Sequence, residues 1–279
     1  MQARRITLII LLGLFSVTGC ETSRRLHDAA SYGDFRQAEF LIDIGARVNW
    51  RDWGGETALH KASFEGYTDI AELLLESGVS PDARTYRERY TALHYAAINN
   101  HADIVEALAE HGARIDSRDK RKRTPLYIAA GQGNAKVVAM LLDHAADPDA
   151  RAKKKYVPLH ACAYSGDTES AMLLIEAGAT VDRKDKRGNT PLLWAASADE
   201  YEMIVFLVGK GANVNAKNKD RSTALDMALR NRNQRMVRFL ISSGSGFDGK
   251  SASIRLRMPR AEVERLAGLR SSSETGPGE

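Results

Sequence analysis

The sequence predicts a solenoid of about seven repeats, each about 33 residues long. The clearest observation is a recurring tetrapeptide with Leu at its third position and, in all but one copy, Thr at its first. The copies begin at Thr57, Thr91, Thr124, Val157, Thr190 and Thr223, with spacings of 34, 33, 33, 33 and 33 residues. A period in this range is typical of solenoids, in which each unit packs only on its neighbours.

Composition and cysteine content agree with a packed repeat protein. The 279 residues are 43% hydrophobic and 27% charged, which excludes a wholly disordered chain and a polytopic membrane protein. The two cysteines, Cys20 and Cys162, are too few for a disulfide scaffold or a four-ligand zinc site. We therefore expect packing alone to hold the fold.

The recurring unit resembles the ankyrin repeat, whose mark is Thr-Pro-Leu-His-x-Ala at a period of 33 residues. Small pairs, leucine pairs and glycines recur in step with the tetrapeptide, as at Ala96-Ala97, Leu141-Leu142 and Gly178. The resemblance implies an all-α ankyrin-repeat solenoid, with two antiparallel helices and a hairpin loop in each unit. The repeat domain is expected over residues 20–244, from a degenerate first unit that begins near Arg24.

Residues 1–19 predict a secretory signal peptide. Arg4 and Arg5 precede an apolar run over residues 6–17, which is too short to span a bilayer of about 30 Å. Small residues then lead to Cys20, an arrangement that resembles the lipobox of bacterial lipoproteins. The resemblance implies cleavage before Cys20, lipid on that residue and, because Glu21 follows it, an outer-membrane location facing the periplasm of a Gram-negative bacterium. The alternative is a general secretory signal that ends near a cysteine.

The repeat pattern stops at Gly244, and residues 245–279 are expected to form a C-terminal extension. Pro259 is expected to open a short helix, since proline is favoured in a first helical turn. We favour a helix that caps the end of the stack over an extension that binds a partner. The composition of residues 271–279 is typical of disorder.

Histidine and cysteine side chains are interpreted as structural. His60, His94 and His160 occupy one slot in three different repeats, so they should lie about 8 to 10 Å apart along the stack. Zinc ligands converge to within about 2 Å of one point. Cys162 stands where other repeats carry alanine and is expected in the core. With no phosphate-binding glycine loop or nucleophile elbow in the sequence, we predict a non-enzymatic protein with no catalytic, metal or cofactor site.

One column of the repeat is basic in every copy. Residues 27 positions after the start of each unit are Arg51, Arg84, Arg118, Arg151, Lys184 and Lys217. Further basic residues of the expected hairpin tips include Arg87, Lys120, Arg121, Arg123, Lys153, Lys154, Lys186 and Arg187. Charged loops are often simply solvated, but one sign repeated six times in one column favours a binding surface.

A second column, two residues before each tetrapeptide, bears on the same question. The ankyrin pattern has glycine there, but this chain carries Gly55, Arg89, Lys122, Lys155, Gly188 and Arg221. A residue other than glycine costs about 1 kcal/mol at positive φ. Either these loops bend differently from the family, or stability has yielded to charge.

Apolar side chains are expected beside the basic column on the concave face of the stack. Those predicted to contact a partner are Trp53, Tyr90 and Tyr156 on hairpin tips and Phe64, Ile98 and Tyr164 on first helices. Aromatic anchors within a charged rim are typical of protein interfaces. The alternative interpretation is partial burial under a neighbouring loop.

These observations predict a lipid-anchored periplasmic protein, monomeric when free, that binds an acidic protein through a basic, aromatic face. Resemblance to ankyrin lipoproteins that neutralise antibacterial phospholipase effectors suggests an immunity protein. The alternative is an envelope protein that docks on anionic lipid or lipopolysaccharide. A pI of about 9.0 would suit a nucleic acid, but the predicted secretion signal excludes that partner.

Overall fold

The computed structural model of the protein describes residues 19–247 and 259–268. Within these residues the chain forms fifteen α-helices, one short 3-10 helix and no strand, which confirms the predicted all-α solenoid. The predicted signal peptide, apart from Gly19, and the predicted disordered tail lie outside the described residues. The chain divides into two compact units, Met1–Arg114 and Ile115–Glu279.

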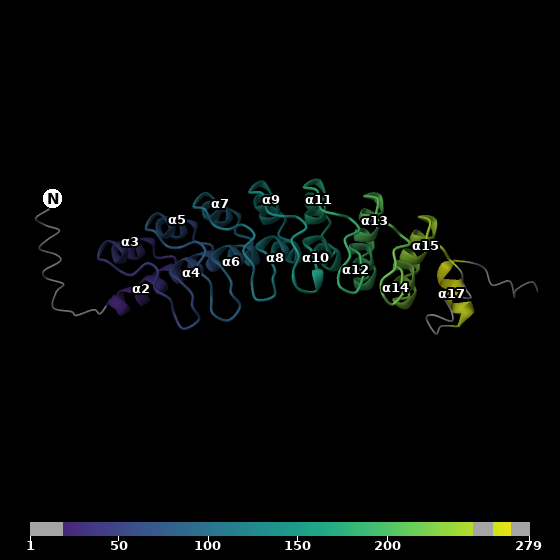
Figure 1. The fold of residues 1–279 in the computed structure, drawn as a ribbon, viewed down its shortest axis with the longest axis horizontal. Coiled ribbons are helices and arrows are strands. Elements are labelled where there is room, and N and C mark those ends of the chain that lie inside the picture. The colour runs from purple at the N-terminus through teal and green to yellow at the C-terminus, as the bar shows by residue number, and fades with distance from the viewer. Residues whose placement is uncertain (1–18, 248–258, 269–279) are drawn as a thin grey trace, which may run out of the picture. The chain divides into compact units, whose positions relative to one another are not determined.

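The described part of the first unit contains three helix pairs. Its first helices form one row and its second helices another, and the connecting loops project as hairpins beside the first helices (Figure 1). The pairs are α2 (Gly19–Tyr32) with α3 (Phe35–Asp43), α4 (Ala58–Glu65) with α5 (Thr68–Glu76), and α6 (Ala92–Asn99) with α7 (Ala102–Glu110). Helix α2 therefore begins before Arg24, and it includes Cys20.

The described part of the second unit contains four helix pairs in the same arrangement and one further helix. The pairs are α8 (Pro125–Gln132) with α9 (Ala135–Asp143), α10 (Pro158–Ser165) with α11 (Thr168–Glu176), α12 (Pro191–Ala198) with α13 (Tyr201–Gly209), and α14 (Ala224–Arg230) with α15 (Gln234–Ser242). A 3-10 helix, η1 (Lys153–Lys155), lies in one hairpin. Helix α17 (Arg260–Ala267) packs against α15 and buries Val263 and Leu266.

The recurring tetrapeptide starts each first helix from the second repeat onward. Its Thr is the N-cap, as at Thr124, whose side chain accepts the N–H of Tyr127. Such a cap satisfies a backbone donor that the first helical turn leaves free. Pro125 at the next position has a fixed φ that suits the first turn. Its Leu, such as Leu126, is fully buried between helices.

Histidines of the tetrapeptide tie neighbouring hairpins together, which agrees with their interpretation as structural residues. The Nδ1 atom of His60 accepts the N–H of Thr57 at 3.0 Å, so the ring proton lies on Nε2, which donates to the carbonyls of Ala83 and Tyr90 at 3.1 and 3.2 Å. Burial lowers the pKa of His60 to about 4, so this imidazole is neutral at pH 7. His160 bonds to Asn189 in the same way, and burial lowers its pKa too.

Cys162 lies in the core of the second unit, as expected from its place among the alanines. Its side chain is buried on α10, with Sγ 3.5 Å from the carbonyl oxygen of Ala130. Burial raises the pKa of the thiol well above its usual value. The thiolate, which is the reactive form, is therefore disfavoured.

Candidate protein-binding surface

Buried acidic residues shape two hairpin tips of the second unit. Asp119 is buried, and its Oδ1 accepts the N–H groups of Arg121 and Arg123 at 2.7 and 2.8 Å. Asp185 does the same for Arg187 and Asn189 at 2.7 and 2.9 Å. The negative charges of these tips are thus turned inward and bound by backbone N–H groups.

The backbone of the hairpins settles how they bend without glycine. Residues Arg89, Lys122, Lys155 and Arg221 have φ of 62°, 61°, 62° and 61°, in the same left-handed region as Gly55 and Gly188 at 79° and 80°. The loops therefore keep the bend that favours glycine, and they do so with long basic side chains. Because this conformation is unfavourable for residues with a Cβ, stability has yielded to charge at these positions.

Neighbouring tips of the second unit are joined by backbone hydrogen bonds. The N–H of Lys153 donates to the carbonyl of Arg121 at 2.9 Å, and that of Lys186 donates to Lys154 at 2.8 Å. A third bond, of 2.9 Å, joins Lys219 to Arg187. The tips of this unit are therefore held in a fixed row, which reduces the ordering cost of binding a partner.

Most of the predicted cations of the second unit are exposed and unpaired. Nine of them make no ion pair within the described residues: Lys120, Arg121, Arg151, Lys153, Lys154, Lys184, Lys186, Arg187 and Lys217. Arg118 and Arg123 also support the tips, since Arg118 donates to the carbonyl of Arg151 at 3.1 Å and Arg123 pairs with Asp119 at 2.8 Å.

Three aromatic side chains meet beside these tips. The ring of Trp194 is T-shaped to those of Tyr156 and Tyr164, with centroid distances of 5.3 and 5.7 Å. Tyr164 is exposed, whereas Tyr156 and Trp194 are half-buried. The structure thus brings two predicted residues together around a tryptophan that the sequence interpretation missed.

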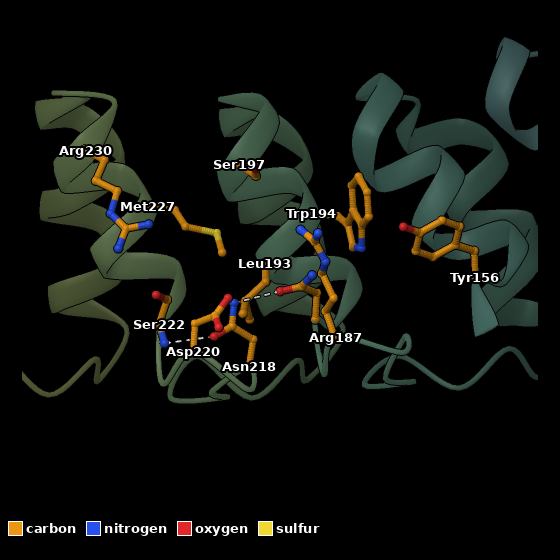
Figure 2. Close-up of a pocket in the computed structure, with 11 residues that line it drawn as sticks. Tyr156, Arg187, Leu193, Trp194, Ser197, Asn218, Asp220, Ser222, Met227 and Arg230 are labelled. Atoms are coloured by element: carbon orange, nitrogen blue, oxygen red, sulfur yellow. Dashed lines mark hydrogen bonds between the residues drawn. The ribbon is translucent and has the colours of Figure 1, made fainter. Parts of the chain in front are cut away.

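Three hollows surround this aromatic cluster, and Tyr156 lines all of them. The largest, of about 510 Å³, has Tyr156 and Trp194 on one side and Met227 and Arg230 on the other, with Arg187 rising from a tip (Figure 2). The other two have volumes of about 400 and 200 Å³. Trp194, Met227 and Arg230 were not predicted as partner-binding residues.

The first unit carries aromatic groups in a different electrostatic setting. Trp53 is fully exposed on a tip and Phe64 is exposed on α4. Tyr90 is half-buried, stacked on His94 with a centroid distance of 5.4 Å, and Ile98 is also half-buried. Partial burial therefore applies to two of these four predicted contact residues.

Predicted cations of the first unit are fewer and partly structural. Arg51 is exposed and its Nη1 donates to the carbonyl of the half-buried Arg84 at 3.5 Å, while Arg87 is exposed. On the same face Lys61 pairs with Asp52 at 3.4 Å and with Glu56. This unit therefore presents mixed charges beside its aromatic groups.

Comparison with known proteins identifies the repeat. The model of the family described as ankyrin repeats (3 copies) matches residues 11–85, 79–152 and 159–251. The chain belongs to the ankyrin-repeat family. The crystal structure of the human ASB11 ankyrin repeat domain is similar, with a TM-score of 0.73 and 27% identity, and the match covers 80% of this chain and 99% of that one.

Curated relatives share shorter stretches of ankyrin repeats. Human protein phosphatase 1 regulatory subunit 27 is 40% identical over 58 residues, 21% of this chain and 38% of the relative. A probable E3 ubiquitin-protein ligase of rice, XBOS32, is 40% identical over 72 residues, 25% of this chain and 14% of the relative. The chain thus spans a minor part of each relative. The ankyrin fold is generally a non-enzymatic scaffold for protein partners.

In the first unit of the ankyrin stack, a polar network links the first helices α4 and α6 to the hairpin that precedes α4. The hydroxyl of Tyr95 donates to Glu56, which also pairs with Lys61. Burial alone would raise the pKa of Glu56, but the bonds from Lys61 and Tyr95 hold it below its usual value. The carboxylate therefore stays charged and matched by Lys61, which fits a structural role.

The start of the ankyrin stack places Cys20 at the surface. Cys20 is exposed and lines a hollow of about 710 Å³ with Arg24, Trp53 and Tyr86. Among the described residues, no helix is long and apolar enough to cross a membrane. In that same part of the chain, no group of three or more His, Cys, Asp and Glu side chains could hold a metal ion.

Proposed function

We propose that this ankyrin-repeat protein is a lipid-anchored periplasmic protein that binds an acidic protein through its basic hairpin tips. The single observation that carries the proposal is the presence of Arg89, Lys122, Lys155 and Arg221 at left-handed backbone positions. Folding favours glycine there, so the basic side chains serve something other than stability. The exposed cations of the second unit, nine of which make no ion pair within the described residues, would attract an acidic surface.

We further propose that the partner is a secreted effector enzyme and that the protein acts as an immunity protein. The support is the resemblance of the sequence to ankyrin lipoproteins that neutralise antibacterial phospholipases. The physical properties of the tips suit this role. An immunity protein must bind before the effector acts, and a concentrated basic surface accelerates association with an acidic partner by about 10- to 1,000-fold.

Lipid attachment would occur on Cys20, which is exposed at the start of α2. We expect the full chain to incorporate labelled palmitate and to sediment with outer membranes, because two or more acyl chains give stable anchoring. The Cys20→Ser variant should incorporate no label and should leave the outer-membrane fraction. Unchanged sedimentation and labelling of that variant would exclude Cys20 as the anchor.

The partner is tested with the full chain in mild detergent, carrying a C-terminal affinity tag. The bait is exposed at low and moderate salt to envelope extract and to the products of adjacent genes. We expect one acidic protein to be retained in an equimolar, salt-sensitive complex. The Arg121→Glu/Arg187→Glu variant should bind it with an association rate at least about tenfold lower.

The control reverses two exposed cations away from the tips of the same unit, Lys136 on α9 and Lys210, the residue that follows α13. The Lys136→Glu/Lys210→Glu variant changes net charge by the same amount but should associate like the parent. Equal association rates for all three proteins would remove the tips from the proposed function. Retention of anionic phospholipid or lipopolysaccharide alone would favour the envelope-docking alternative instead.

A further inference from the structure

The smallest of the three hollows in the second unit is mainly apolar, and hydrogen bonds hold part of its wall. It is lined by Tyr127, Gly131, Tyr156, Ala161, Tyr164 and Trp194, together with His160. The indole Nε1 of Trp194 already donates to Asp185 at 3.2 Å, and both ring nitrogens of His160 are bonded to backbone groups. We call this site the apolar hollow; hydrogen bonds hold two of its wall residues, Trp194 and His160, before any partner arrives.

Two small residues keep the apolar hollow open. At the position equivalent to Gly131, the other repeats from the second onward carry Phe64, Ile98, Tyr164, Ser197 and Arg230. Gly131 lies inside α8, where glycine is less favourable than alanine. A Cβ at this position would lie 3.4 Å from the Cβ of Ala161, so the backbone leaves room for alanine. The helix therefore carries a destabilising residue whose absent side chain leaves the hollow empty.

Cations border the apolar hollow through the two larger hollows that share its walls. The hollow of about 400 Å³, which shares Tyr127 and Tyr156, is lined by Arg121, Lys153 and Lys154. The hollow of about 510 Å³, which shares Tyr156 and Trp194, is lined by Arg187 and Arg230. In the described part of the chain, Asp220 is the one acidic residue that lines any of the three.

The volume and charge of this arrangement restrict what it can bind. A volume of about 200 Å³ is below the range of about 300 to 1,000 Å³ that small-molecule sites occupy, but it admits one large apolar side chain. The bordering cations would pair with carboxylates on both sides of that residue. Such a central apolar anchor with a charged surround is how protein interfaces concentrate their binding energy.

We propose that the apolar hollow seats one aromatic or leucine-sized side chain from an acidic segment of the partner protein. Carboxylates that precede and follow this anchor pair with Arg121 and Lys153 on one side and with Arg187 and Arg230 on the other. The inference rests on the proposed function, because it names the part of the acidic partner that the tips would hold.

The test uses the full chain in detergent and fluorescent eleven-residue peptides as probes. The first peptide has one central Phe flanked by Glu and Asp, the second replaces Phe with Ser, and the third replaces the acidic residues with amides. We expect the first peptide to bind at low salt, and each of the others to bind at least about tenfold more weakly.

Gly131 offers a matched pair of protein variants. Gly131→Ala improves the helix and leaves most of the hollow open, so its affinity for the first peptide should stay within twofold of the parent. Gly131→Leu fills the hollow, so its affinity should fall at least about tenfold. Neither variant should unfold at a lower temperature than the parent, because both replace a helical glycine; misfolding therefore cannot mimic the result.

The outcomes separate this inference from the proposed function. Equal binding of the Phe and Ser peptides, or unchanged binding by Gly131→Leu, would overturn the anchor site. If the partner protein still required Arg121 and Arg187 in that case, the proposed function would survive without the anchor. If neither the tip reversal nor Gly131→Leu affected binding of partner or peptide, both proposals would fall.

Discussion

Two slots of the repeat hold the backbone in the same left-handed conformation but carry different residues. The slot after each second helix has φ between 77° and 93° where it is glycine, at Gly45, Gly78, Gly112, Gly178, Gly211 and Gly244; Ala145 is the exception. The hairpin slot carries Gly55 and Gly188, but also Arg89, Lys122, Lys155 and Arg221.

Space does not explain this difference. A Cβ added to any of the six glycines after the second helices would meet no atom within 4 Å, so the backbone angle alone favours glycine there. The same angle disfavours the four basic residues of the hairpin slot. After the second helices, six of the seven repeats carry the glycine that a left-handed backbone favours. In the hairpin slot, four repeats carry a basic residue in that conformation instead. The glycines at the second-helix ends follow the requirements of folding, whereas the basic residues at the hairpin tips do not, which supports the proposal that the tips bind a partner.

The largest expected change in stability comes from a core residue, and it shows what a substitution that affects folding alone should do. Leu174 is fully buried on α11. Leu174→Ala should lower the free energy of unfolding by about 2 to 5 kcal/mol, because it removes apolar contacts and leaves a cavity. Urea titration followed by circular dichroism measures it. Partner affinity should fall only under conditions in which the variant is partly unfolded. A lower affinity of the fully folded variant would contradict the separation of a folding core from binding tips.

Acid should weaken the histidine links at the base of the hairpins. The pKa of His60 is about 4 in the fold and about 6.5 in an unfolded chain, so the unfolded state binds more protons between these values. Stability is full above about pH 6.5 and falls as pH drops towards 4, by about 3 kcal/mol from this residue. Unfolding free energies measured from pH 7 to 4 test this.

The variant His60→Leu supplies the control for acid. Leu193 occupies the equivalent slot of a later repeat and is fully buried, so leucine fits this position in the fold. The variant loses the hairpin hydrogen bonds and should be less stable at pH 7, but its stability should depend less steeply on pH between 6.5 and 4.5. An unchanged slope would show that His60 does not carry the effect.

Sequence predicted the fold because its rules are local and repeated. The capping Thr124, the helix-opening Pro125 and the buried Leu126 each act within one or two turns, so the period alone placed the helices. The basic residues of the tips could also be predicted, because their charge and their place in the loops follow from the sequence without knowledge of tertiary contacts. By contrast, Trp194 and the space at Gly131 form a hollow only together with residues of neighbouring repeats.

Comparing equivalent positions of the repeats would have predicted part of this hollow. Trp194 shares its column with Lys61, Tyr95, Ile128, Ala161 and Met227, and these residues lie three positions before the column of Phe64 and Tyr164, so they face the same side of the first helices. Whether each of these residues is exposed depends on the size of the side chains in the next repeat. The repeat period does not specify those sizes. The repeat pattern also does not predict that Arg118 donates a hydrogen bond to the backbone carbonyl of Arg151.

Restoring glycine to the hairpin slot should exchange binding for stability. Lys122→Gly and Arg221→Gly each remove a residue held at φ of 61°, so each should stabilise the fold by about 1 kcal/mol, and the pair by about 2. Partner association should slow several-fold because two positive charges are lost. Urea titration and stopped-flow association measure the two effects. If the double variant is stabilised but binds the partner as fast as the parent, these two charges do not contribute to binding.

The smallest expected effect, from Ala145→Gly, separates relief of strain from loss of charge. Ala145 is the one residue other than glycine in the slot after the second helices, with φ of 60°. Its replacement should stabilise the fold by about 1 kcal/mol, as Lys122→Gly does, but should leave partner association unchanged because no charge is removed. If relief of backbone strain by itself slows association, Ala145→Gly should slow it as well. The slower association of Lys122→Gly would then be due to the change in the backbone and not to the lost charge. If only Lys122→Gly slows association, the side chain is what the partner contacts, and the cost in stability at the tips is explained by binding.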